Sequence, residues 1–161
     1  MTDRLIFALT LIAVLGTGLV AGTFFAFSTF VMKALAARPP AEGIAAMQAI
    51  NVKVINPWFL GTFTGTALLC GLGVIVSLTR WSQPGAVYLL IGCLVYIIGS
   101  FVQTFVFHIP RNNALDALDP SGVDSADRWA WFVSTWTAWN HVRTVASAAA
   151  SLLLVASLVA A

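Results

Sequence analysis

The chain has 161 residues, of which 60% are hydrophobic and only 9% are charged, and its formal net charge is +2. Because a soluble domain is about 25% charged, this composition excludes an ordinary water-facing surface and predicts an integral membrane protein. The small net charge and the lack of basic runs argue against a nucleic-acid partner. The length suits a single domain, which we place at residues 1–161.

Four segments are apolar over the roughly 20 residues that a spanning helix needs: residues 5–32, 58–78, 87–107 and 142–160. The apolar run of the first segment exceeds the about 7–15 residues of a signal-peptide core, so we expect a retained helix. GxxxG pairs occur in the first two segments, at Gly18 with Gly22 and at Gly61 with Gly65. They predict close helix packing in lipid, and the alternative is that glycine is simply frequent in membrane helices.

The links between the segments differ in length. RWSQPG at residues 80–85 predicts a short turn, because of its Pro-Gly pair. The first long link contains AEGIAAMQAINVKVINPWF, whose apolar residues recur at roughly helical spacing. We therefore expect a short interfacial helix there, closed by Asn56-Pro57, since the residue before a proline resists helical geometry.

The second long link follows residue 107. We expect Pro110 to end the third helix and bend the chain, residues 116–127 to form a loop, and helix to resume at Trp129. Both long links then lie on the same side of the membrane. The sequence thus predicts an all-α, integral membrane, antiparallel four-helix bundle.

Basic residues are unevenly divided between the two sides. The side of the long links carries six of them, Lys33, Arg38, Lys53, Arg111, Arg128 and Arg143, and the other side carries Arg4 and Arg80. The positive-inside rule would put the long links in the cytoplasm. We expect the bacterial inner membrane as the location, and the sequence leaves self-association as a homo-oligomer open.

The most unusual stretch is WAWFVSTWTAWNHVRT at residues 129–144, which holds four of the six tryptophans. At helical spacing, one face carries aromatic rings followed by a cation: Trp129, Phe132, Trp136, Trp139 or Asn140, and Arg143. An aromatic belt at the membrane interface would explain the tryptophans alone. It does not explain Asn140, His141 and Arg143 at the start of an otherwise apolar helix, where ionisable groups tend to face a cavity.

A second polar group follows the third segment. FHIPRNNALDAL at residues 107–118 contains His108, Arg111 and Asn112, and the first long link adds Asn51 and Asn56 on the same side. These residues are expected at one membrane level. The alternative is that each makes only interfacial hydrogen bonds.

The residue types indicate which chemistry such a cluster could perform. A neutral histidine is a proton acceptor near neutral pH, arginine and asparagine donors hold an oxyanion, and tryptophan faces hold a flat aromatic. Two histidines are too few for a catalytic metal with three protein ligands, so we assign no metal site, and a metal held between the two histidines stays open. Axial ligation of a haem by His108 or His141 stays open.

Four segments resemble the DUF1772, or anthrone oxygenase, family: GTFFAFSTFVMKAL, MQAINVKVINPWF, FHIPRNNALDAL and WNHVRTVAS. The resemblance implies a four-helix membrane protein. It also implies oxidation of an anthrone to a quinone with molecular oxygen and without metal or flavin. The expected partners are a small lipophilic aromatic substrate and membrane lipid.

With that chemistry in view, we assign roles to the candidate residues. His141 is the expected base, with His108 as the alternative. Arg143 and Arg111 would stabilise an enolate or peroxide, and Asn140 and Asn112 would orient the reacting groups. The substrate pocket would be lined by Trp136, Trp139, Trp129, Asn51 and Asn56. Two other functions stay open: a non-enzymatic binder of a hydrophobic ligand or haem, and a structural membrane accessory protein.

Overall fold

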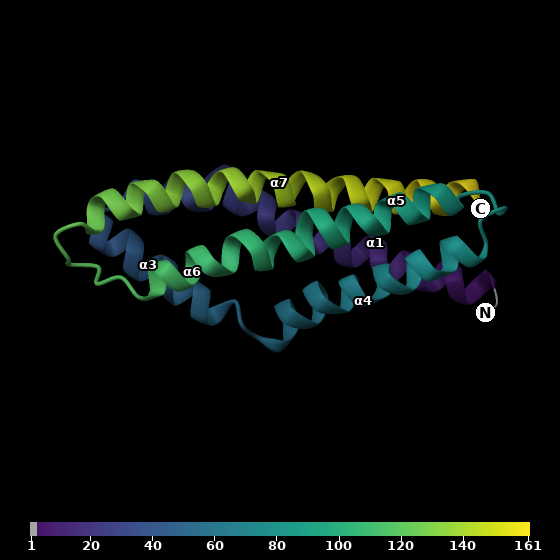
Figure 1. The fold of residues 1–161 in the computed structure, drawn as a ribbon, viewed down its shortest axis with the longest axis horizontal. Helices are drawn as coiled ribbons and strands as arrows, with labels where there is room; N and C mark the ends of the chain where they lie inside the picture. Colours follow the sequence, from purple (N-terminus) through teal and green to yellow (C-terminus); the bar gives the residue numbers. More distant parts are fainter. Residues whose placement is uncertain (1–2) are drawn as a thin grey trace.

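The computed structural model describes residues 3–161, whose regular elements are all helical (Figure 1). The α-helices are α1 (Asp3–Ala26), α2 (Met32–Ala36), α3 (Pro40–Lys53), α4 (Pro57–Thr79), α5 (Ala86–Tyr96), α6 (Ile109–Asp116) and α7 (Ser125–Ala160). Three π-helical segments join some of them: η1 (Phe27–Val31), η2 (Ile97–Val102) and η3 (Thr104–His108).

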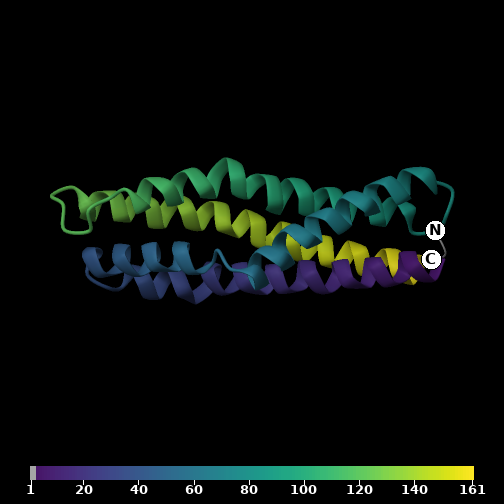
Figure 2. The same ribbon diagram turned by 90° about the horizontal axis from the view of Figure 1, so that it is seen from below.

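Continuous runs of these elements make four long helices, each long and apolar enough to cross a membrane: Asp3–Ala36, Pro57–Thr79, Ala86–Asp116 and Ser125–Ala160. Figures 1 and 2 show them side by side, with α3, α6 and the α6–α7 loop at one end. The α4–α5 turn lies at the other end. We call these the loop end and the turn end. The predicted four-helix membrane architecture, with both long links on one side, is confirmed.

The position of the bilayer follows from α4. Its 23 residues extend about 35 Å at 1.5 Å per residue, close to the roughly 30 Å hydrocarbon core. Trp58 at its start is 87% exposed and Trp81 just beyond its end is 55% exposed. Because exposed tryptophans favour membrane interfaces, the hydrocarbon lies between these two levels. The loop end beyond Trp58 therefore projects from the hydrocarbon.

The third long helix departs from prediction at Pro110. It does not end there but continues to Asp116, and the following loop is shorter than expected because α7 already begins at Ser125. A proline inside a helix lacks an N–H donor and crowds the carbonyl four residues back. The chain accommodates it through η3, in which the Ile109 N–H donates to the Thr104 carbonyl five residues back.

The first long link folds as expected into a helix, α3. Asn56 then caps α4, since its side chain accepts hydrogen bonds from the backbone N–H groups of Trp58 and Phe59 at 3.1 and 3.0 Å. Pro57 occupies the first turn, where its missing N–H costs nothing. The Asn-Pro pair therefore starts α4 as well as separating it from α3.

The GxxxG prediction is wrong. A Cβ atom would meet nothing within 4 Å at Gly22, Gly61 or Gly65, and at Gly18 the nearest atom is 3.8 Å away. The helices approach closely at other glycines. A Cβ at Gly99 would lie 2.6 Å from the Ala146 Cβ on α7. At Gly85, where φ is +81°, it would lie 2.5 Å from the Ser157 carbonyl oxygen.

Two buried apolar clusters hold the bundle together. One extends toward the turn end and contains Ala13, Val20, Phe24, Phe63, Cys70, Leu89, Cys93, Tyr96, Ala150 and Leu154. The other joins α2 and α3 to α6 and α7 at the loop end and contains Met32, Ile44, Met47, Leu115, Trp129, Phe132 and Trp136. Between the two clusters lies the cavity described next.

Candidate active site

A cavity of about 340 Å³ lies between α1, α3, α4, η3, α6 and α7. This volume is within the range of about 300–1,000 Å³ typical of small-molecule sites. Aromatic rings of Phe24, Phe27, Phe59, Phe63, Phe105 and Trp136 line it, and its polar lining includes Asn51, Thr104, His108, Asn112, Asn113, Asp116 and Arg143. A largely apolar hollow with a few convergent polar groups is the usual form of a ligand site.

His108 is the most unusual polar residue of the cavity wall. It is 1% exposed, and neither of its buried ring nitrogens has a hydrogen-bond partner among the described residues. Its ring meets the Trp136 indole edge-to-face, with centroids 5.0 Å apart and an interplanar angle of 84°. Buried polar atoms are nearly always hydrogen-bonded. The Trp136 backbone lies within reach of this ring, which leaves at least one ring nitrogen available to a ligand.

Arg143 brings a positive charge to the same cavity. It is 6% exposed, and within residues 3–161 no carboxylate lies at ion-pair distance from it. Its guanidinium carbon lies 3.9 Å from the centroid of the Phe24 ring and 4.9 Å from that of Trp136. A buried cation without a counter-ion is costly, and an anionic group in the cavity would offset that cost.

Asn140, which does not itself line the cavity, holds Arg143 in place. The Arg143 Nε donates to Asn140 Oδ1 at 2.7 Å, and Asn140 Nδ2 donates to the Phe24 carbonyl and to Ser28 Oγ at 2.8 and 2.7 Å. The contact with Phe24 lies just before the π-helical segment η1. Asn140 is fully buried, so it orients the arginine rather than touching a ligand.

Trp136 connects the two sides of the site. Its Nε1 donates to Asn112 Oδ1 at 2.9 Å, its ring faces Arg143, and its edge meets His108. One indole thus sets the positions of three polar side chains from two helices. The prediction that Trp136 lines a pocket matches this placement.

Asp116 is a cavity residue that we did not predict. His108, Asn112 and Asp116 are spaced four residues apart, so they follow one face of the helix that continues past Pro110. Asn51 of α3 donates to Asp116 Oδ1 at 2.9 Å. The spacing was visible in the sequence, but the expectation that the helix ended at Pro110 concealed it.

His141, our first candidate for the base, lies elsewhere. It is exposed and borders a shallow surface groove with Ser28, Lys33 and Thr137. The adjacent residue Asn140 points into the bundle, and one helical step turns a side chain by about 100°. The two histidines therefore line different hollows of the surface, and the cavity contains only His108 of the two.

The other predicted residues have structural contacts outside the cavity. Arg111 donates to the Phe107 carbonyl at 2.7 Å and faces the Trp131 ring. Trp139 stacks on Phe107 with centroids 3.5 Å apart. Trp129 is packed in the loop-end cluster, and Asn56 caps α4. Asn51, in contrast, lines the cavity as predicted.

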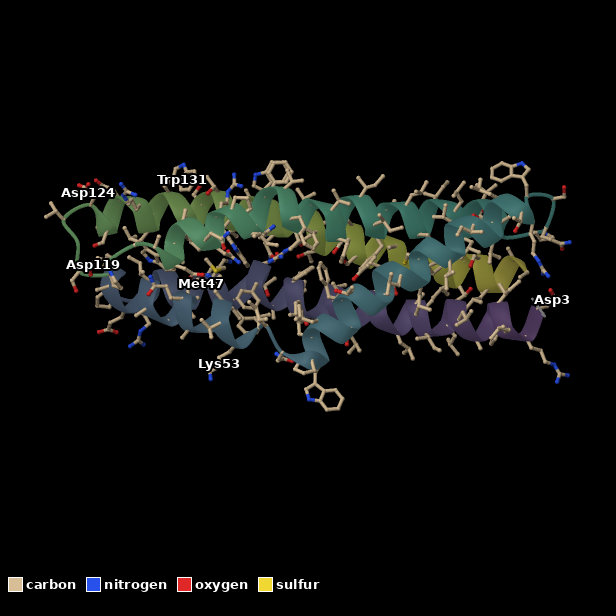
Figure 3. All side chains as sticks on the ribbon, turned by 60° about the horizontal axis from the view of Figure 1, so that its bottom comes forward. Asp3, Met47, Lys53, Asp119, Asp124 and Trp131 are labelled. Atoms are coloured by element: carbon tan, nitrogen blue, oxygen red, sulfur yellow. The ribbon has the colours of Figure 1, made fainter. Side chains whose placement is uncertain are left out.

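Figure 3 shows that polar side chains are unevenly distributed along the molecule. Side-chain nitrogen atoms gather in the half that contains Asp119 and Asp124, with a smaller group at the end near Asp3. Met47 points inward between the helices, whereas Lys53 and Trp131 point away from them.

Among residues 3–161, no three His, Cys, Asp or Glu side chains are placed to hold a metal ion together.

A comparison with protein families matches the anthrone oxygenase model to residues 56–153. The chain belongs to the anthrone oxygenase family. The matched range contains the cavity residues of the third helix and of α7, including His108 and Arg143, whereas α1 and α3 lie outside it. No curated protein and no solved structure matches the chain.

Proposed function

We propose that this member of the anthrone oxygenase family is a membrane-bound oxygenase that converts a small lipophilic aromatic, such as an anthrone, to a quinone with molecular oxygen. One observation carries the proposal. Counting partners among residues 3–161, His108 is a buried imidazole with two unbonded nitrogens, and it lines the same aromatic cavity as Arg143, a buried cation without a carboxylate partner. These two side chains, on one largely apolar cavity, support the roles of base and oxyanion partner that we propose for them.

The chemistry needs both groups. An anthrone carries an acidic methylene opposite its ketone, and His108 removes one of its protons. The resulting enolate oxygen is negative, and Arg143 stabilises it electrostatically. The enolate is electron-rich enough to transfer an electron to oxygen directly, so we propose that no metal or flavin takes part.

The remaining steps balance as follows. The carbon radical and superoxide combine into a carbon–oxygen bond, and the proton held by His108 returns to give a hydroperoxide. The O–O bond of that species then breaks, and the second methylene proton and the outer OH group leave together as water, which leaves a ketone. One oxygen atom of O₂ enters the product and the other becomes water, so the methylene is oxidised and oxygen is reduced.

The aromatic lining supports a flat substrate. Phe59 and Phe63 stack at 5.8 Å between centroids with an interplanar angle of 10°, and Phe63 contacts Phe101 and Tyr96 on its other sides. Trp136 on α7 and Phe27 on η1, whose ring centroids are 5.6 Å apart, also line the cavity. Rings from different helices around one cavity favour a planar ligand.

We also propose that the loop end faces the cytoplasm. Lys33, Arg38, Lys53, Arg111 and Arg128 lie toward that end, and the positive-inside rule favours this orientation. A cysteine-accessibility assay on Lys53→Cys in intact cells, with Trp81→Cys at the turn end as the control, would test it.

The function itself is tested with purified protein, an anthrone and ¹⁸O₂. We expect oxygen uptake above the spontaneous rate, one O₂ consumed per quinone formed, one ¹⁸O atom in the product and no accumulation of hydrogen peroxide. Peroxide formed in equal amount would indicate an oxidase instead. Binding of the anthrone without any uptake would support the alternative of a non-enzymatic binder.

A further inference from the structure

The cavity is open along one side, where exposed lining residues form a slot. One edge of the slot is made by Ile55, Leu60 and Thr64 on α4 and the segment before it. The other edge is made by Phe105, Ile109, Asn113 and Asp116 on η3 and α6. The slot exists because α4 packs on α5 and η2 but diverges from η3 and α6, as Figure 1 shows.

The two halves of the slot differ in polarity. Leu60, Phe105 and Ile109 are 41%, 52% and 38% exposed, and they line the half nearer the turn end. Asn113 and Asp116 line the half at the loop end. Leu60 and Thr64 follow Trp58 along α4, so they lie on the hydrocarbon side of the interface that Trp58 marks. The apolar half of the slot therefore faces lipid acyl chains.

The cavity is covered on the water side by α3. Gln48 Nε2 donates to the Leu115 and Leu118 carbonyls at 2.9 and 3.0 Å, and Asn51 Nδ2 donates to Asp116 Oδ1 at 2.9 Å. Ile44 and Met47 fill the space below them and are at most 1% exposed. Three hydrogen bonds and a buried apolar face thus tie α3 to α6, so α3 covers the cavity at the loop end, and the opening toward water is the polar half of the slot beside Asn113 and Asp116.

We propose that the ligand enters and leaves the cavity sideways, from the bilayer hydrocarbon, through the apolar half of the slot between α4 and η3. The ligand is a flat, uncharged aromatic dissolved in the membrane, and it becomes anionic only inside the cavity. The identity of this ligand class rests on the proposed function. The path depends only on the exposed apolar edge, which suits an uncharged aromatic better than the polar half beside Asn113 and Asp116 does.

The test measures binding rates of 1,8-dihydroxyanthraquinone to the protein in phosphatidylcholine vesicles, under nitrogen, by quenching of tryptophan fluorescence. Thr64→Phe narrows the slot, and Leu68→Phe is the matched control. Leu68 lies one turn further along α4, is 68% exposed and does not line the cavity. Because an obstacle in a passage slows both directions, we expect association and dissociation in Thr64→Phe to fall together by about tenfold, with Kd unchanged. A tenfold fall in both rates corresponds to an activation free energy of passage that is about 1.4 kcal/mol higher.

Several results would overturn the path. The first is equal binding rates in Thr64→Phe and Leu68→Phe. The second is a faster association in Asn51→Ala that does not slow when Thr64→Phe is added to the same protein. The third is no quenching in the unmodified protein. The measurement excludes oxygen, so it separates the path from catalysis. Slowed binding in Thr64→Phe without oxygen uptake by the unmodified protein would keep the path and reject the oxygenase.

Discussion

The two halves of the bundle satisfy their buried polar groups in different ways. Toward the turn end, the hydroxyls of Thr10, Thr17, Ser77 and Ser157 each donate to a carbonyl three or four residues back on their own helix. Toward the loop end, side chains bond across helices: Asn140 to Phe24 and Ser28, Gln103 to Trp139, and Trp136 to Asn112. His108 is left with two unbonded nitrogens.

This difference separates a scaffold from a site. A hydroxyl that bonds within its own helix makes no demand on neighbouring helices, so the turn-end half is held mainly by packing of apolar and small side chains. Bonds that cross helices there run from Tyr96 to the Phe63 carbonyl and from Ser151 to the Val14 carbonyl. Groups that bond across helices depend on a particular arrangement of three chain segments, and His108, whose ring nitrogens are left over, lines the cavity. Substitutions should therefore impair stability in one half and activity in the other.

The largest effect is expected at His108. His108→Ala removes the proposed base, and oxygen uptake with an anthrone should fall by about 10²–10⁴-fold, the usual contribution of a general base. His141→Ala is the matched control, because that side chain is exposed on another face, and its activity should equal that of the unmodified protein. A large loss in His141→Ala with activity retained in His108→Ala would reverse the assignment.

Arg143 should separate activity from stability. Arg143→Met removes the oxyanion partner, so turnover should fall by about 10²–10³-fold. It also removes a buried charge whose desolvation costs several kcal/mol, which offsets the hydrogen bond lost at Asn140, so the thermal midpoint in detergent should not fall. Arg143→Lys keeps the charge without the planar donors and should recover part of the activity. A clear drop in the midpoint of Arg143→Met would show that the arginine is mainly structural.

In the packed half, matched glycine substitutions should differ. Gly99→Ala would place a Cβ 2.6 Å from the Ala146 Cβ on α7, and overpacking of this kind costs about 1–3 kcal/mol of unfolding free energy. Gly65→Ala meets nothing within 4 Å and should leave stability unchanged or slightly raised, since alanine favours helix over glycine. Denaturation in mixed detergent micelles measures both. Equal midpoints for the two variants would contradict the close approach at Gly99.

The smallest effects should distinguish two tryptophans. Trp136→Phe loses the hydrogen bond to Asn112, worth about 1 kcal/mol, so kcat should fall severalfold. Trp139→Phe keeps its stack on Phe107 outside the cavity, so kcat should change by less than a factor of about two, within the few tenths of a kcal/mol typical of such surface changes. Steady-state oxygen uptake by both variants provides the comparison. A greater loss in Trp139→Phe would place the substrate on the other side of α7.

Much of the fold was predictable from local sequence. The four apolar runs are as long as a bilayer is thick, and the helix of the first long link and the buried face of residues 129, 132, 136, 140 and 143 follow from helical periodicity. The end of the third helix was not predictable in this way, because a proline usually marks a helix boundary. Only the packed structure shows that the π-helical turns before Pro110 let the helix continue.

The sequence by itself determined that the protein lies in a membrane, where its four spans are, on which side the long links lie and which residue types are available for chemistry. Each of these depends on hydrophobicity and on spacing along one helix. The tertiary structure decided which histidine faces the cavity. The rotation of α7 is set by its contacts with α1, through Asn140 and Phe24, and one residue of rotation exchanges inside for outside. The tertiary structure also aligned Asp116 with His108, since that alignment requires an unbroken helix through Pro110.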